Sequence, residues 1–71
     1  MMPLAFADIG NKSTIKKIGG LPEVKRHLEN LGFVVGGSVT VISKLNENII
    51  VSVKESRVAI DQNTAHKIMV Q

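Results

Sequence analysis

The sequence contains no cysteine, tryptophan or tyrosine, and only two of its 71 residues are phenylalanine. The absence of cysteine excludes disulfide bonds and thiolate metal sites. The proline-rich peptide groove of a true SH3 domain is lined with aromatic side chains, so Phe6 and Phe33 cannot form one. Platforms for stacking the bases of single-stranded nucleic acid are equally scarce. Several common kinds of binding site are therefore excluded or disfavoured by composition alone.

Long hydrophobic runs are also missing. No stretch approaches the roughly 18 apolar residues of a membrane-spanning helix. The first eight residues lack both the cationic flank and the long apolar run of a signal peptide. We therefore expect a cytoplasmic protein that does not insert into a membrane.

Patterns that carry catalysis are absent as well. The sequence has no Cys–His pair, no serine in a strand-to-helix elbow, no phosphate-binding glycine motif and no evident acid–base pair. His27 and His66 are its only imidazole ligands, and neither has a partner histidine or a carboxylate cluster at ligand spacing. We therefore predict that the protein is not an enzyme and has no metal site and no cofactor.

What the sequence does contain is aliphatic side chains and a modest positive charge. Hydrophobic residues make up 44% of the chain, and nine basic against six acidic residues give a net charge of +3. A chain this short predicts a single domain, residues 1–71, in which most aliphatic side chains must be buried. The net charge permits an acidic protein partner or a nucleic acid.

Residues 21–31 have the spacing of an amphipathic helix. Their apolar residues recur at steps of three, four and three, and are Leu21, Val24, Leu28 and Leu31. Pro22 suits the first helical position. Gly32 follows the last apolar residue, where a helix ends in the left-handed conformation, and Phe33 can make the apolar contact that closes a Schellman cap.

Alternating apolar residues predict two central strands over residues 38–44 and 49–54. With Val41 opposite Val51 on the inner face, the same register places Ile42 opposite Ile50 on the outer face. A three-residue loop would join these strands, with Asn46 or Asn48 in the left-handed conformation.

Shorter elements flank this pair of strands. Residues 13–18 predict a first strand with a bulge near Lys16 and Lys17, which would turn Ile15 and Ile18 to the same face. Residues 57–60 predict another strand, followed by a short helix capped by Asp61 and a terminal strand at 68–70. Together the elements predict a mainly β fold with one or two short helices: a small five-stranded barrel that closes on itself, with the amphipathic helix packed against it.

The motif Leu28-x-x-Leu31-Gly32-Phe33-x-x-Gly36-x-x-Val39-x-Val41, followed by Ile49-x-Val51-x-Val53, Ala59-Ile60, Ala65, Ile68 and Val70, resembles the FeoA family. The resemblance covers residues 15–70; the departure is a short connection, Leu45–Asn48, where family members often have a longer loop. It implies an SH3-like barrel and an accessory or regulatory role in bacterial ferrous-iron uptake. The implied partner is the cytosolic G-protein-like domain or core of a FeoB-type iron transporter. An association with transition metal ions is also implied by the family.

Two apolar surfaces are candidates for docking such a partner. One is the seam between helix and barrel, with Leu28, Leu31, Phe33 and Val34, and the other is the outward pair Ile42 and Ile50. The alternative for both is that other parts of the chain cover them. A different function, binding of nucleic acid or the ribosome, would use a basic face with Lys16, Lys17, Lys25 and Arg26, which could equally be a solvated surface. Weak self-association is a third alternative.

Overall fold

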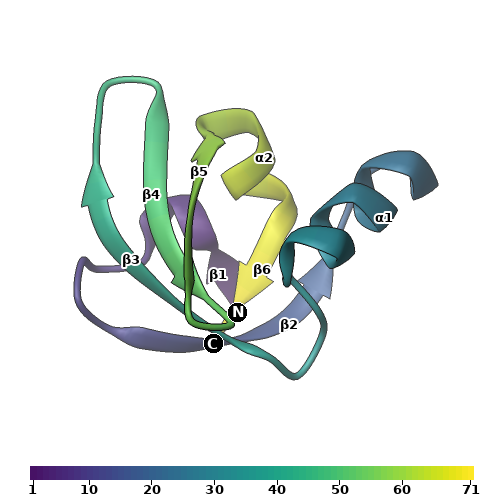
Figure 1. Ribbon diagram of the computed structural model, residues 1–71, viewed down its shortest axis with the longest axis horizontal. Helices are drawn as coiled ribbons and strands as arrows, with labels where there is room; N and C mark the ends of the chain where they lie inside the picture. Colours follow the sequence, from purple (N-terminus) through teal and green to yellow (C-terminus); the bar gives the residue numbers. More distant parts are fainter.

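The computed structural model describes all residues, 1–71, and consists of short strands with two α-helices and one 3-10 helix (Figure 1). In chain order the elements are β1 (Met2–Pro3), the 3-10 helix η1 (Leu4–Phe6), β2 (Lys12–Ile18), α1 (Pro22–Leu31), β3 (Ser38–Lys44), β4 (Asn48–Val53), β5 (Ser56–Asp61), α2 (Gln62–Lys67) and β6 (Ile68–Val70). Neither α-helix has the length and apolarity needed to cross a bilayer.

The strands form one antiparallel sheet in the order β1-β6-β2-β3-β4-β5, which curls around the core. This confirms the predicted mainly β, SH3-like barrel. Two details differ from the prediction. The sheet has a sixth strand, because the two residues of β1 pair with β6. It also does not close through hydrogen bonds, because β1 and β5 are its two ends; α2 packs against both of them and against η1.

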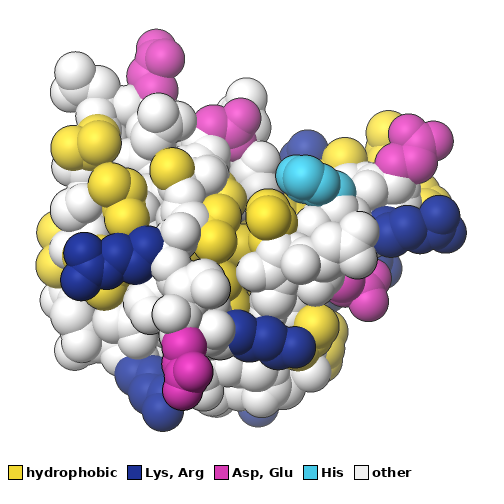
Figure 2. Space-filling model, viewed as in Figure 1, with side chains coloured by type: hydrophobic (Ala, Val, Ile, Leu, Met, Phe, Trp, Pro, Cys, Tyr) yellow, Lys and Arg dark blue, Asp and Glu magenta, His cyan; other side chains and the backbone are white.

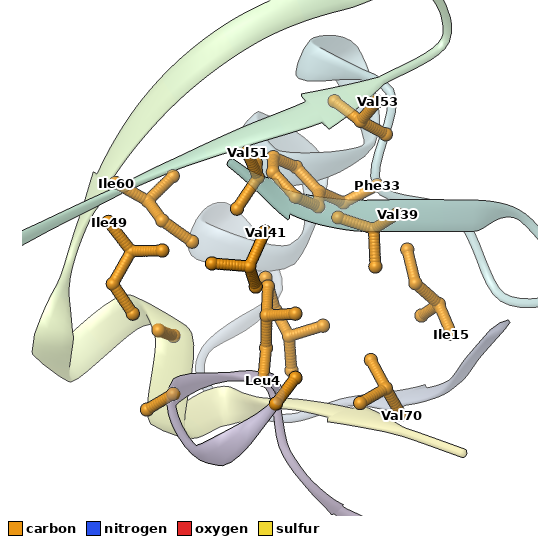
Figure 3. Packing of buried hydrophobic residues seen from close by; sticks show 14 of the residues in the cluster. Leu4, Ile15, Phe33, Val39, Val41, Ile49, Val51, Val53, Ile60 and Val70 are labelled. Carbon is orange, nitrogen blue, oxygen red and sulfur yellow. The ribbon is translucent and has the colours of Figure 1, made fainter. Parts of the chain in front are cut away.

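The interior is a single cluster of 16 buried hydrophobic residues contributed by strands and helices alike. Figure 3 shows side chains from β3, β4 and β6 pointing toward one another inside the barrel. The every-second-residue alternation of β3 and β4 places Val39, Val41, Ile49, Val51 and Val53 on this inner face, as the sequence predicts. Phe33, which follows α1, is fully buried among them.

The bulge predicted in the first strand is confirmed. The register of β2 against β6 shifts between Ile15 and Lys17, so one extra residue reverses the side-chain phase. As a result, both Ile15 and Ile18 are buried although they lie three residues apart.

The hairpin of β3 and β4 pairs Val41 with Val51 as predicted, but the outer pair differs. A second bulge lies between Val41 and Ser43, so that Ser43 rather than Ile42 is the register partner of Ile50. The predicted left-handed asparagine is also wrong, since Lys54 and Glu55 are the only non-glycine residues with positive φ. The bulge takes up the extra residue, and the hairpin ends in a turn where the Leu45 N–H donates to the Asn48 carbonyl at 2.8 Å.

The C-terminal end of α1 has the predicted Schellman cap. Gly32 has φ +110°, its N–H donates to the Glu29 carbonyl at 3.0 Å, and the Phe33 N–H donates to the Leu28 carbonyl at 2.9 Å. The beginning of the helix differs from the prediction, because the Leu21 side chain is 68% exposed.

The reason for this exposure is the direction of α1, which extends away from the strands with its first turn farthest from them (Figure 1). Apolar residues of α1 after Leu21 do reach the barrel. Leu28 is buried there, while Val24 and Leu31 are partly buried against the core. The predicted amphipathic helix is present, and it packs against the barrel by Val24, Leu28 and Leu31.

Candidate functional site

The projection of α1 leaves a groove between this helix, the second half of β2 and the loop that follows the helix. Its volume is about 500 Å³, and its lining consists of Lys16, Lys17, Ile18, Lys25, Glu29, Val34 and Val35. We refer to it below as the basic groove. Figure 2 shows basic, acidic and hydrophobic side chains near one another along α1 and the loop after it.

One wall of the basic groove is a tight turn that the fold holds against β2. The Gly37 N–H donates to the Val34 carbonyl at 2.9 Å, and Gly36 has φ +91°, a conformation that favours glycine. Two further bonds tie the turn to Ile15: the Gly36 N–H donates to the Ile15 carbonyl and the Ile15 N–H donates to the Gly37 carbonyl, both at 2.8 Å. Val35 therefore sits at a fixed position on the rim, with 66% of its surface exposed.

The charge of the basic groove comes from two elements. The bulge in β2 supplies Lys16 and Lys17, and α1 supplies Lys25 together with Glu29, one helical turn further along. Three ammonium groups thus face one carboxylate. Like charges gathered along a cleft raise the local concentration of ligands of the opposite sign. The groove is suited to an acidic group next to a small apolar one.

The structure brings together residues from two surfaces that the sequence treats separately. Lys16, Lys17 and Lys25 of the predicted basic face and Val34 of the predicted apolar seam all line the basic groove. Arg26 is exposed on α1 but is not part of the lining.

Two members of the predicted apolar seam are not on the surface. Leu28 and Phe33 are buried in the core, and Leu31 is partly buried against it, so intramolecular packing uses most of this seam. The helical spacing and the cap predict this packing, but they do not reveal that so little of the seam remains exposed. Leu28 and Phe33 are therefore corrected to core residues.

The second predicted apolar surface lies on the outer face of the β3–β4 hairpin. Ile42 and Ile50 are half-buried there, and the exposed Ala59 of β5 is the register partner of Ile50. Hydrophobic side chains are visible over this hairpin in Figure 2. They form a small apolar surface without a groove among them.

Three parts of the basic groove do not stand out in the sequence. In the sequence, Val35 only continues an apolar run. Glu29 is predicted to be a weak ion-pair partner of Lys25 on a solvated helix face. Ile18 is predicted as a core residue, and its side chain is in fact buried. The turn signal at Gly36 is the one local feature that could have indicated an exposed Val35.

The possible metal ligands do not converge. No three side chains of the types that bind metals lie together, with His27 on α1 and His66 on α2. The His66 Nδ1–H donates to the Gln62 carbonyl at 2.7 Å, and the ring packs edge-to-face with Phe6 at a centroid distance of 5.3 Å. These residues do not fit a resident metal ion.

Comparison with known proteins bears on the whole chain. The model of the FeoA domain family matches residues 2–71. The chain belongs to the FeoA family. A curated protein of Methanocaldococcus jannaschii, named "Putative Fe(2+) transport protein A", is 38% identical over all 71 residues, which span 87% of that protein.

Solved structures of FeoA proteins have the same fold. The crystal structure of an iron uptake regulatory protein, FeoA, superposes with a TM-score of 0.89 at 28% identity, covering 99% of this chain and 93% of the other. Stenotrophomonas maltophilia FeoA, crystallised with zinc and described as an SH3 domain protein, gives a TM-score of 0.88 at 25% identity, covering 100% and 91%. The match to the FeoA domain thus covers residues 2–71, and the fold is SH3-like.

Proposed function

We propose that this FeoA domain is a non-catalytic accessory protein of ferrous-iron uptake in the cytoplasm, and that it binds the cytosolic part of a FeoB-type iron transporter. The observation that carries the proposal is the basic groove, an open surface that combines charge with exposed apolar atoms. Such a combination is typical of sites that recognise another protein. Ferrous iron in this proposal is the cargo of the transporter.

The names of related proteins support a role in ferrous-iron transport. The M. jannaschii protein carries a name that refers to Fe(2+) transport. The S. maltophilia protein has been suggested to act as a ferrous iron transport activating factor. A small domain that activates a transporter directly must contact it, and the exposed surfaces of this chain can provide such a contact.

The direct experiment is co-purification with the cognate transporter. The tagged 71-residue chain is immobilised and incubated with detergent-solubilised transporter, once without nucleotide and once with a non-hydrolysable GTP analogue. We expect the transporter to be retained in at least one of these states. Failure to retain the full-length transporter in both states would refute the proposal.

Nucleic-acid binding is the second function that the basic residues suggest, and the geometry favours it less. A surface binds the phosphate backbone of a nucleic acid more tightly when several cations lie on one continuous face. Here Glu29 lies in the groove with the lysines, and Val34 and Val35 form part of its wall. A steeply salt-dependent complex with duplex DNA or RNA would reverse this preference.

A further inference from the structure

The floor of the basic groove contains a main-chain N–H and C=O that are not paired with another strand. Near one end of β2, Thr14 and Gln71 exchange both of their hydrogen bonds, at 3.0 and 2.9 Å. Beyond the bulge, the Gly19 N–H donates to the Lys67 carbonyl at 2.7 Å, and Ile18 is the register partner of Ile68. In an antiparallel ladder every second residue turns its N–H and C=O away from the neighbouring strand. Ile18 is therefore a residue whose N–H and C=O point away from β6.

No strand lies on the side to which these groups point. The pairing of β2 with β3 covers only Lys12, Ser13 and Thr14, after which β3 diverges from β2. Ile18 also lines the basic groove, although only 5% of the whole residue is exposed. Because the ladder turns the N–H and C=O of Ile18 to this side, these two groups border the groove. The second half of β2 is an internal free edge, bordered by Lys16 and Lys17.

We propose that the basic groove binds an extended, acidic segment of a partner protein, which adds to the free edge of β2 as a short strand. The N–H and C=O of Ile18 would pair with the main chain of the segment. Its carboxylates would meet Lys16, Lys17 and Lys25, and the apolar side chains between them would rest on Val34 and Val35. This inference rests on the proposed function for the identity of the partner, since the FeoB-type transporter is the protein we expect to carry the segment.

The chemistry of the groove favours a peptide over other anions. A phosphate group or a lipid headgroup can bind the lysines, but it does not present a main-chain donor and acceptor side by side to the N–H and C=O of Ile18. An extended peptide offers both a donor and an acceptor at the spacing of a β-ladder. Because successive side chains of a strand point to opposite sides, an alternating acidic and apolar sequence can satisfy the lysines and the valines together.

The first test uses a defined probe peptide, about nine residues of alternating glutamate and valine with blocked ends, which is long enough to cover a strand of ordinary length. The isotope-labelled full chain is titrated with the peptide and followed by amide NMR shifts. We expect shifts at Lys16, Lys17, Ile18, Lys25 and Val35. A second peptide with the same side chains is N-methylated at alternate residues, which removes the donors along one edge. It should bind about three- to tenfold more weakly, because it cannot donate to the Ile18 carbonyl. Equal binding of the two peptides would show that no strand is added and would overturn the proposal.

A pair of charge-reversal variants tests the location of the site. Lys16→Glu with Lys25→Glu removes two cations of the groove, while Lys12→Glu with Lys44→Glu makes the same change of net charge at exposed lysines outside it. At about 150 mM salt, long-range attraction is screened. We expect the affinity for the probe peptide to fall about tenfold in the first variant and less than about twofold in the second. Equal losses would indicate only a general attraction to a basic protein and would overturn the proposal. So would inorganic phosphate at about 10 mM displacing the peptide from the unmodified chain completely, since simple ions would then suffice.

The same variants separate this inference from the proposed function. If Lys16→Glu with Lys25→Glu retains the full-length transporter as well as the unmodified chain does, the transporter docks elsewhere and the groove inference fails while the proposed function stands. If the unmodified chain retains no transporter but still binds the probe peptide in the groove, the proposed function fails and the recognition of acidic strands stands. Thermal unfolding of each variant confirms that it is folded before binding is compared.

Discussion

At the scale of single residues, the most unusual backbone is in the turn between β4 and β5. Lys54 and Glu55 have φ of 48° and 64°, and they connect the register partners Val53 and Ser56. A two-residue hairpin with both central residues left-handed is the type I′ turn, for which Asn-Gly is the preferred sequence. Left-handed backbone costs an ordinary side chain about 1–2 kcal/mol.

A contact with Gly32 gives a structural reason for a lysine at position 54. A Cβ atom added to Gly32 would lie 3.4 Å from the Lys54 Cγ, so the lysine stem covers the glycine that caps α1. This contact links the β4–β5 turn to the point where α1 leaves the barrel. No comparable contact is evident for Glu55, which is exposed.

We therefore predict that Glu55→Gly stabilises the protein. Glycine accepts the left-handed conformation without strain, and after its greater entropy in the unfolded chain is subtracted, the free energy of unfolding should rise by about 0.5–1 kcal/mol. The matched control is Glu47→Gly in the β3–β4 loop, which has no residue of positive φ and should lose stability. Urea unfolding of both variants measures the difference, and a destabilised Glu55→Gly would contradict the explanation.

At the scale of elements, α2 shows how one cap holds a six-residue helix. The Thr64 N–H donates to Asp61 Oδ1 at 2.7 Å, which is the predicted N-cap. The side chain and the N–H of Thr64 act as hydrogen-bond donors to Asp61 and, assisted by the positive charge of Lys67, hold the pKa of the Asp61 carboxyl below its ordinary value. The helix matters because it packs against β1, β5 and η1, where the sheet is not closed.

The lowered pKa of Asp61 predicts a pH dependence with a definite sign. A carboxyl whose pKa is lower in the folded state contributes stability above its unfolded pKa of about 4, and this contribution is lost as the pH falls through the folded pKa. Asp61→Asn keeps a capping oxygen that does not titrate. The thermal midpoint of the unmodified chain should therefore fall relative to that of Asp61→Asn between about pH 5 and pH 2.

Because all other carboxyls are common to both proteins, the difference between the two midpoints isolates Asp61. Asp61→Ala, which lacks any cap, should be less stable than both at neutral pH. A constant difference between the unmodified chain and Asp61→Asn over the acid range would show that the cap does not depend on the charge.

At the scale of the whole molecule, the barrel depends on one continuous core. Phe33 is fully buried, whereas the other phenylalanine, Phe6, is 63% exposed and lies against His66. A chain of this size has little stability to spare, near the lower end of the usual 5–15 kcal/mol.

The two phenylalanines thus form a natural pair for mutation. Phe33→Ala should lower the free energy of unfolding by about 3–5 kcal/mol, which removes most of the stability expected of a chain of this size. Phe6→Ala should change the free energy of unfolding by less than about 1 kcal/mol. Circular dichroism and amide NMR spectra measure both. Loss of only part of the amide peaks in Phe33→Ala would argue against a single cooperative core.

Much of the fold was predictable because its signals are local. The alternation in β3 and β4, the glycine cap of α1, the bulge at Lys16 and Lys17 and the Asp61 cap each follow from a few neighbouring residues and the period of one element. The predictions are wrong where the position of a residue depends on how its element packs against another element. The bulge at Ile42 depends on how β3 and β4 twist together, and the exposure of Leu21 depends on the direction in which α1 leaves the barrel.

The candidate site was predictable only in pieces. The sequence alone determines the alternating strands and the helix that ends at a glycine. It also shows that the lysines are present without a catalytic motif. Only the tertiary structure places Lys16 and Lys17 of β2 together with Lys25 of α1 and Val35, and only its ladder turns the main-chain groups of Ile18 away from β6. The physical reason is that periodicity and capping act within a few residues, whereas the groove results from hydrogen bonds and packing between segments far apart in the chain.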